Sequence, residues 1–97
     1  MKYKVIFETA SVENHFRKPM SRIPQKFQDD IMHAIESLSD NPRRHGVIKI
    51  VPPVHLFNLQ AYYRIRVSDY RVLYNINDIR KVVSIIDLAK RDEKTYK

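Results

Sequence analysis

Residues 63–74 read YRIRVSDYRVLY, so that apolar and cationic side chains alternate before a short polar pair, and one more arginine follows that pair in a largely apolar segment. A period of two is typical of a strand with one buried face, and Ser68-Asp69 suits a tight turn. The stretch therefore predicts a β-hairpin, with strands over residues 63–67 and 70–76. Tyr63 and its alternate neighbours should face the core.

Three further segments are predicted to be strands. Residues 2–8 alternate in part, residues 47–51 are rich in β-branched side chains, and residues 81–88 form a nearly continuous apolar run. Because prolines cannot donate to a ladder, the second segment should stop at Pro52-Pro53 and be short. Because residues 81–88 are apolar on both faces, they should lie centrally in the sheet.

The region between the first two strands is predicted to be helical. Residues 11–20 repeat apolar side chains at helical spacing and should end at Pro19. Residues 23–38 carry a clear amphipathic stripe, with Pro24 in the permissive first turn and a stop at residues 40–42. The whole chain, 1–97, is thus expected to be a single α+β domain with an N-terminal strand, a helical hairpin and then a three- to four-stranded antiparallel sheet.

Composition narrows the class of protein. Ninety-seven residues leave no room for a second domain, and the absence of cysteine excludes disulfides and thiolate metal sites. The sequence has no apolar run near the length of a membrane helix and no secretory signal at its start, so we expect no membrane association and a cytoplasmic location. The formal charge of +7 favours a polyanionic partner, although it could equally serve solubility.

The predicted hairpin gathers positive charge. Arg64 and Arg66, two residues apart on a strand, share a face, and Arg71 on the next strand lies alongside them. Such a cluster is costly unless an anion occupies it, and guanidinium groups match phosphate oxygens well. The alternative is a solvated strand face, whose arginines pair with the carboxylates of Asp69, Asp78 or Asp87. Spacing alone leaves both open.

The sequence lacks the residue patterns of a metal site and of a glycine-rich phosphate-binding loop. The histidines, at 15, 33, 45 and 55, are 18, 12 and 10 residues apart, which does not suit a metal site. Gly46 is the only glycine, so there is no phosphate-binding loop. We therefore expect neither a metal nor a cofactor. Tyr63 and Tyr70 should pack in the core, whereas Tyr62 could pack or stack on a base.

The hairpin resembles the signature segment of the RelE/ParE toxin superfamily, usually of the form Y-R-I-R-x-G-D-Y-R-V-x-Y. Residues 7–8, 31–38 and 41–42 are similar to its first strand, second helix and following loop. The resemblance implies the toxin of a type II toxin–antitoxin system. RelE-like members cleave messenger RNA in the ribosomal A site, and ParE-like members poison DNA gyrase on a similar scaffold. ParE-like members tend to lack paired cations on the third strand, which favours the RNA-cleaving kind here.

The resemblance also implies a site. Its expected catalytic residues are Arg64, Arg66, Arg71, Arg91 and Tyr96, which together would support metal-independent attack by a 2′-hydroxyl. Further candidates for RNA contacts are Lys49, Tyr62, Lys90 and Lys94. Arg66 stands where some members have a lysine base, and because a guanidinium is hard to deprotonate, the identity of the general base stays open. Ser68 replaces the usual glycine of the turn.

The expected partners follow from the same resemblance. They are an acidic, partly disordered cognate antitoxin, the ribosome and its messenger RNA, with DNA contacted only indirectly through the antitoxin. Two alternatives to the ribosome-dependent endoribonuclease remain: a gyrase inhibitor and a nucleic-acid-binding module without catalysis.

Overall fold

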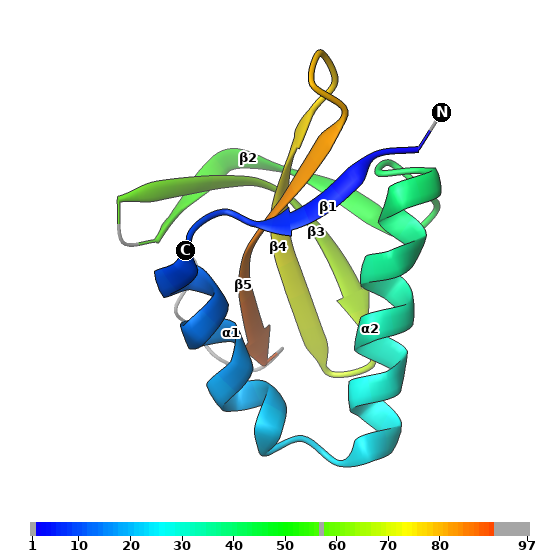
Figure 1. The fold of residues 1–97 in the computed structure, drawn as a ribbon, viewed down its shortest axis with the longest axis vertical. Coiled ribbons are helices and arrows are strands. Elements are labelled where there is room, and N and C mark those ends of the chain that lie inside the picture. The colour runs from blue at the N-terminus through cyan, green and yellow to red at the C-terminus, as the bar shows by residue number, and fades with distance from the viewer. Residues whose placement is uncertain (1, 57, 91–97) are drawn as a thin grey trace.

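Two helices cover one face of a five-stranded mixed sheet (Figure 1). The computed structural model describes residues 2–56 and 58–90. Its elements in chain order are β1 (Lys4–Phe7), α1 (Ala10–Ser21), α2 (Gln25–Asp40), β2 (Val47–Leu56), β3 (Leu59–Val67), β4 (Tyr70–Asn77) and β5 (Val82–Lys90). The predicted α+β class is confirmed.

The strand order is β1-β5-β4-β3-β2. Strands β2 to β5 form the predicted antiparallel meander, and β5 lies between β1 and β4, as its apolar sequence indicates. The sheet is wider than predicted, because β1 joins it as a fifth strand parallel to β5. This parallel pairing depends on the helical hairpin, which carries the chain back across one face before the meander begins.

The first helix runs past its proline. Thr9 caps α1 by accepting a hydrogen bond from the amide of Val12 at 3.1 Å, and the helix continues through Pro19 to Ser21. The prediction that Pro19 ends it was wrong. The amides of Arg22 and Ile23 bond back to the carbonyls of Pro19 and Met20, three residues earlier, so a tightened last turn forms beyond the proline.

The strand β2 also runs past its prolines, so the prediction of a short strand ending at Pro52 was wrong. Its pairing with β3 jumps from Lys49 opposite Tyr63 to Val54 opposite Ala61. Residues 50–53 are thus accommodated in a bulge that needs no donors from the prolines, and β2 is an edge strand, where such bulges are tolerated.

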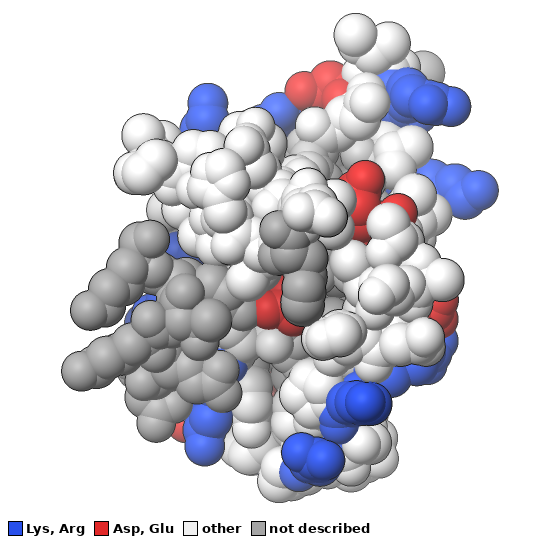
Figure 2. All heavy atoms as spheres, turned by 90° about the vertical axis from the view of Figure 1, so that its left-hand side faces the viewer, with Lys and Arg blue, Asp and Glu red and all other residues white. Residues whose placement is uncertain are grey.

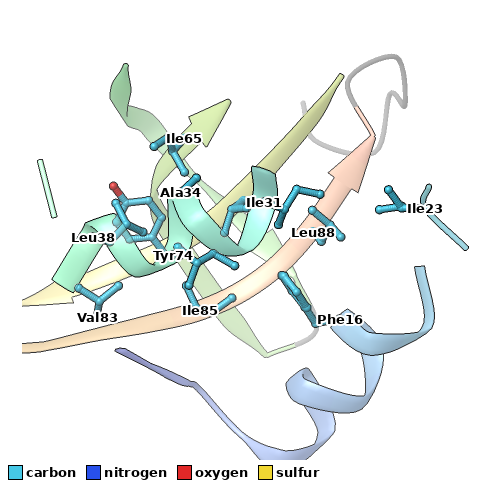
Figure 3. Close-up of a cluster of buried hydrophobic side chains, with 12 residues drawn as sticks. Phe16, Ile23, Ile31, Ala34, Leu38, Ile65, Tyr74, Val83, Ile85 and Leu88 are labelled. Carbon is cyan, nitrogen blue, oxygen red and sulfur yellow. The ribbon is translucent and has the colours of Figure 1, made fainter. Parts of the chain in front are cut away.

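The main core lies between the helices and the sheet (Figure 3). Ile31 and Leu38 of α2 and Tyr74 of β4 are fully buried there, and the Tyr74 hydroxyl donates to the carbonyl oxygen of Pro42 at 2.6 Å. The predicted inward face of the hairpin is confirmed, since Ile65 is buried and its alternate neighbours Tyr63 and Val67 pack against the same core, as does Tyr70.

A second apolar cluster occupies the opposite face of the sheet. Ala61, Leu73 and Ile86 are buried in it, and the partly buried Ile50, Val54, Leu56 and Leu59 of the β2–β3 hairpin pack around them. Because Leu73 lies between Val72 and Tyr74 of the main core, strand alternation places it on the face without helices. The extended β2–β3 hairpin therefore builds a small core of its own.

Polar contacts attach the first strand to the β4–β5 turn. Asp78 accepts two hydrogen bonds from Arg43, at 3.0 and 2.8 Å, and a third from the hydroxyl of Tyr3 at 2.7 Å. The guanidinium of Arg43 also lies over the ring of Tyr63. These contacts join three segments that are far apart in sequence.

In the part of the chain that the structure describes, no helix is long and apolar enough to cross a membrane.

Candidate phosphate-binding site

The register of the β3–β4 hairpin brings three arginines together. Arg66 is directly opposite Arg71, and Arg64 is opposite Leu73 of the second apolar cluster. Their neighbours Ile65 and Val72, also opposite one another, are buried under the helices. Because side chains alternate along a strand, the three guanidinium groups share the helix-free face.

Within this cluster, the charge of Arg64 is disfavoured. Burial lowers the pKa of the Arg64 guanidinium, and repulsion from Arg71 and Arg66 lowers it further. The Nε atom of Arg71 is buried and has no hydrogen-bond partner among the described residues. A desolvated donor and repelling cations both favour the arrival of an anion, which would satisfy one and neutralise the other.

The alternative to an anion site is that the arginines pair with carboxylates of the protein itself. One of the three candidate carboxylates, that of Asp78, is engaged elsewhere. Asp78 pairs with Arg43 at the far end of β4, and this pairing, followed by the hydrogen bond from Tyr3, holds the pKa of its carboxyl well below the usual range. Arg66 itself donates a long 3.4 Å bond to the carbonyl of Ser68 in its own turn. Ser68 has a φ of 55°, a left-handed conformation that a glycine adopts at lower cost.

A cavity of about 210 Å³ opens beside two of the arginines. Arg64 and Arg71 line it together with three apolar side chains, Ile50, Val54 and Leu73. None of these three residues was predicted to belong to a site, and Val54 lies beyond Pro52, where the second strand was predicted to stop. The signal that was available is the alternation of Val54 and Leu56 beyond the prolines.

A larger hollow of about 410 Å³ lies where β3 extends beyond the start of β2. Arg66 and Arg44 line it with His33, His45 and Asp30, from the helix and the loop that precede β2. Arg44 was also missed by the sequence analysis, because its loop position carries no periodic signal. Positive charge thus continues from the hairpin towards α2.

The structure does not bring the other residues predicted for the site into the arginine cluster. Lys49 is exposed and opposite Tyr63, whose ring packs under the helices, so the register assigns Lys49 to the opposite face from the arginine cluster. Tyr62 is 40% exposed, and its hydroxyl donates to Gln60 at 2.5 Å. Lys90 ends β5 opposite Tyr70 and lines a separate cavity with it. Arg91, Lys94 and Tyr96 lie outside the described residues.

The surroundings of the site show neither a single basic patch on the face seen in Figure 2 nor a metal-binding group among the described residues. On the face seen in Figure 2, Lys and Arg side chains stand mainly around the margin of a largely uncharged area, so the charge there is dispersed rather than gathered in one patch. Within residues 2–56 and 58–90, no group of three His, Asp or Glu side chains is placed to hold a metal ion. The arginine cluster itself follows from the register of β3 and β4.

Comparison with known proteins identifies the family. A sequence model described as the ParE toxin of the type II toxin–antitoxin system parDE matches residues 8–95. The chain belongs to the RelE/ParE toxin superfamily. This confirms the resemblance seen in the hairpin, and it makes the protein the toxin of a toxin–antitoxin system.

Solved structures of RelE toxins share the fold of this RelE/ParE toxin. The archaeal RelE–RelB complex from Pyrococcus horikoshii contains a chain with 26% identity and a TM-score of 0.72, and the match covers 96% of this chain and 99% of that one. The toxin–antitoxin complex RelBE2 from Mycobacterium tuberculosis matches at 22% identity and a TM-score of 0.66, covering 94% and 100%.

An arginine double mutant of Escherichia coli toxin RelE in the free state matches at 18% identity and a TM-score of 0.60, covering 95% of this toxin and 86% of that chain. A search of curated proteins gave no significant match. The family model and the structural neighbours therefore represent the two kinds of member, ParE and RelE, on one scaffold.

Proposed function

We propose that this toxin is a ribosome-dependent endoribonuclease that cleaves messenger RNA in the A site and so inhibits translation. The observation that carries the proposal is the gathering of Arg64, Arg66 and Arg71 on the helix-free face, with repulsion and desolvation that a phosphate would relieve. The likeness to a RelE chain at 26% identity supports it.

The chemistry assigned to the cluster is an in-line transfer at phosphorus. The 2′-hydroxyl gives its proton to a base, and its oxygen forms a bond to phosphorus as the bond to the 5′-oxygen breaks and that oxygen takes up a proton. The products are a 2′,3′-cyclic phosphate and a free 5′-hydroxyl. The guanidinium groups stabilise the charge that develops on the phosphate oxygens, the role that a metal ion fills in other nucleases. Arg64, with its lowered pKa, is a better proton donor to the leaving oxygen than an ordinary arginine.

The C-terminal sequence completes the proposed site. The strand β5 ends at Lys90, and its neighbour Ala89 is opposite Arg71, so the last described residues lie at the edge of the arginine cluster. We include Arg91 and Tyr96 in the catalytic set from their sequence positions, with Tyr62 and Lys94 as RNA contacts. Lys49 and Lys90, which the register assigns to the helix-covered face, are retained only as contacts on that opposite face.

The proposed partners are a cognate antitoxin and the ribosome, both in the cytoplasm. Two solved structures with this fold are toxin–antitoxin complexes, and a chain of charge +7 would attract an acidic antitoxin segment. Contacts with DNA would then be made mainly by the antitoxin.

The test is to add purified toxin to translating ribosomes and map the new 5′ ends of the messenger RNA. Wild-type toxin should cut within codons, and the double substitution Arg64→Ala with Arg71→Ala should abolish the cuts. Arg80→Ala is the matched control, because it removes an exposed guanidinium in the turn before β5, beyond the opposite end of β4 from Arg71. Unchanged cleavage by the double variant would exclude the assigned site.

A second candidate, inhibition of DNA gyrase, is favoured by the description of the matching family model. It requires double-strand breaks and a DNA-damage response on induction, with the messenger RNA intact. Following DNA breaks and RNA ends in the same induced culture separates the two functions. RNA affinity without new RNA ends would instead indicate a binding module.

A further inference from the structure

The cavity beside Arg64 and Arg71 has an apolar floor, which makes no polar contact with a phosphate. Ile50, Val54 and Leu73 form this floor, and Leu73, only 1% exposed, continues into the second apolar cluster. We infer that the cavity receives one base of the RNA strand whose phosphate the arginine cluster binds, so that the β2–β3 hairpin contributes to the choice of cleavage site. The inference rests on the proposed function and deepens it.

The size of the cavity fits this occupant. Its volume is about 210 Å³. An engineered protein cavity of about 150 Å³ binds a benzene molecule, so there is room for a heterocyclic ring with exocyclic groups. A phosphate alone would leave the apolar floor uncovered.

The chemistry of the lining also suits a nucleotide. A nucleotide joins a flat, weakly polar ring to an anion through one sugar, and the lining joins an apolar floor to two guanidinium groups. Planar guanidinium groups stack on the flat face of a base. They cannot stack in this way on a branched aliphatic side chain, such as one inserted by a protein partner. Because a guanidinium group carries five N–H donors, Arg71 can bind a phosphate through some of them and donate to an acceptor on the base edge through others.

The bulge in β2 is what builds the floor. Ile50 is the first residue of the bulge and Val54 directly follows it, yet both pack against the same cluster as Leu73. A regular short strand ending at Pro52 would lack Val54 altogether. The two prolines therefore lie in the bulge, between the two β2 residues that form part of the floor.

The experiment compares two substitutions of equal bulk on the same strand. Val54→Phe fills the cavity, whereas Val51→Phe adds the same atoms at a position that is 81% exposed and does not line it. Each folded variant is titrated with adenosine monophosphate and, separately, with ribose 5-phosphate, and the two dissociation constants are compared by NMR. The ratio reports the base alone.

Wild-type protein should bind the nucleotide about 10-fold more tightly than the sugar phosphate, the gain of a stacked base. Val54→Phe should bring the ratio close to one, and Val51→Phe should leave it unchanged. Val54→Ala, which removes part of the floor without adding bulk, should lower the ratio about 2-fold and serves as the second variant if Val54→Phe does not fold. In 5′-end mapping, Val54→Phe should alter the nucleotide preference at the cuts, and Val51→Phe should not.

The outcomes separate the two proposals. A wild-type ratio near one overturns the base site, even if messenger RNA is cleaved. A ratio that responds only to Val54→Phe in a protein that makes no RNA ends supports the base site while refuting the nuclease. If Val54→Phe leaves the nucleotide ratio intact but weakens binding of the antitoxin, and Val51→Phe does not, the cavity belongs to an antitoxin side chain and the inference is wrong.

Discussion

Burial and then two neighbouring guanidinium groups lower the pKa of Arg64, so we expect its charge to oppose folding of the free toxin. Replacement by Met keeps the aliphatic stem and removes the charge. We expect Arg64→Met to raise the free energy of unfolding by a few tenths to about 1 kcal/mol, more at low salt than at high salt, while cleavage is lost. Urea unfolding at two salt concentrations measures this. Equal stability of Arg64→Met and wild type at both would contradict the repulsion described.

Asp78 acts in the opposite direction, since its pKa is lowered by the hydrogen bonds from Arg43 and then Tyr3. A lowered carboxyl pKa stabilises the fold above the ordinary value of about 3.9, and this contribution disappears as the pH falls below it. Thermal unfolding between about pH 6 and 2 should therefore show a shallower loss of stability on the acid side for Asp78→Asn than for wild type.

Asp40→Asn is the control for this pH series. It removes a carboxylate whose pairing with Lys2, at 3.6 Å, is highly exposed and should contribute little. Parallel acid limbs for Asp78→Asn and wild type would show that the Arg43–Asp78–Tyr3 contacts do not stabilise the fold.

At the level of elements, Asn75 substitutes for part of the ladder between β3 and β4. Direct pairing of the two strands ends at Tyr63 opposite Tyr74. Beyond it, the Asn75 side chain accepts a 2.7 Å bond from the amide of Tyr62 and donates a 2.6 Å bond to the carbonyl of Gln60. These two bonds hold the β2–β3 hairpin to the rest of the sheet where the strands separate.

Asn75→Ala should lower the free energy of unfolding by about 1–3 kcal/mol, because two backbone groups lose their partner. It should also speed hydrogen exchange at the Tyr62 amide more than at amides in the helices. Asn77→Ala is the comparison, since it removes one side-chain bond to the amide of Arg80 within a turn. If the exchange rate at Tyr62 stays at its wild-type value, Asn75 does not bridge the strands in solution.

For the molecule as a whole, the charge of +7 and the arginine cluster make separable contributions to RNA binding. Arg71→Ala and Arg80→Ala lower the net charge equally, but only the first removes a proposed phosphate contact. In a plot of log affinity for single-stranded RNA against log salt concentration, Arg71→Ala should reduce the slope by about 0.7 and Arg80→Ala should leave it unchanged. Equal changes for both variants would show that binding follows total charge and not the site.

Local patterns in the sequence were sufficient for much of this architecture. Alternation over residues 63–74 indicated the hairpin, its inward face and the shared face of Arg64 and Arg66, and the apolar run of residues 81–88 indicated a central strand. Both rest on periodicity, which is a property of neighbouring residues and is readable without the fold. The family signature lies in the same hairpin and therefore came from the same segment.

Contacts distant in sequence were decided only by the tertiary structure. The parallel partnership of β1 with β5, the continuation of β2 past Pro52 and the continuation of α1 past Pro19 depend on what each segment packs against, which overrides local propensity. So does the cavity, whose floor comes from β2 and β4 and whose arginines come from β3 and β4. The sequence by itself determined which residues carry positive charge on one strand face, because alternation is a local property. The fold determined that part of this charge lies partly buried beside an apolar cavity, because the cavity is built from segments distant in sequence.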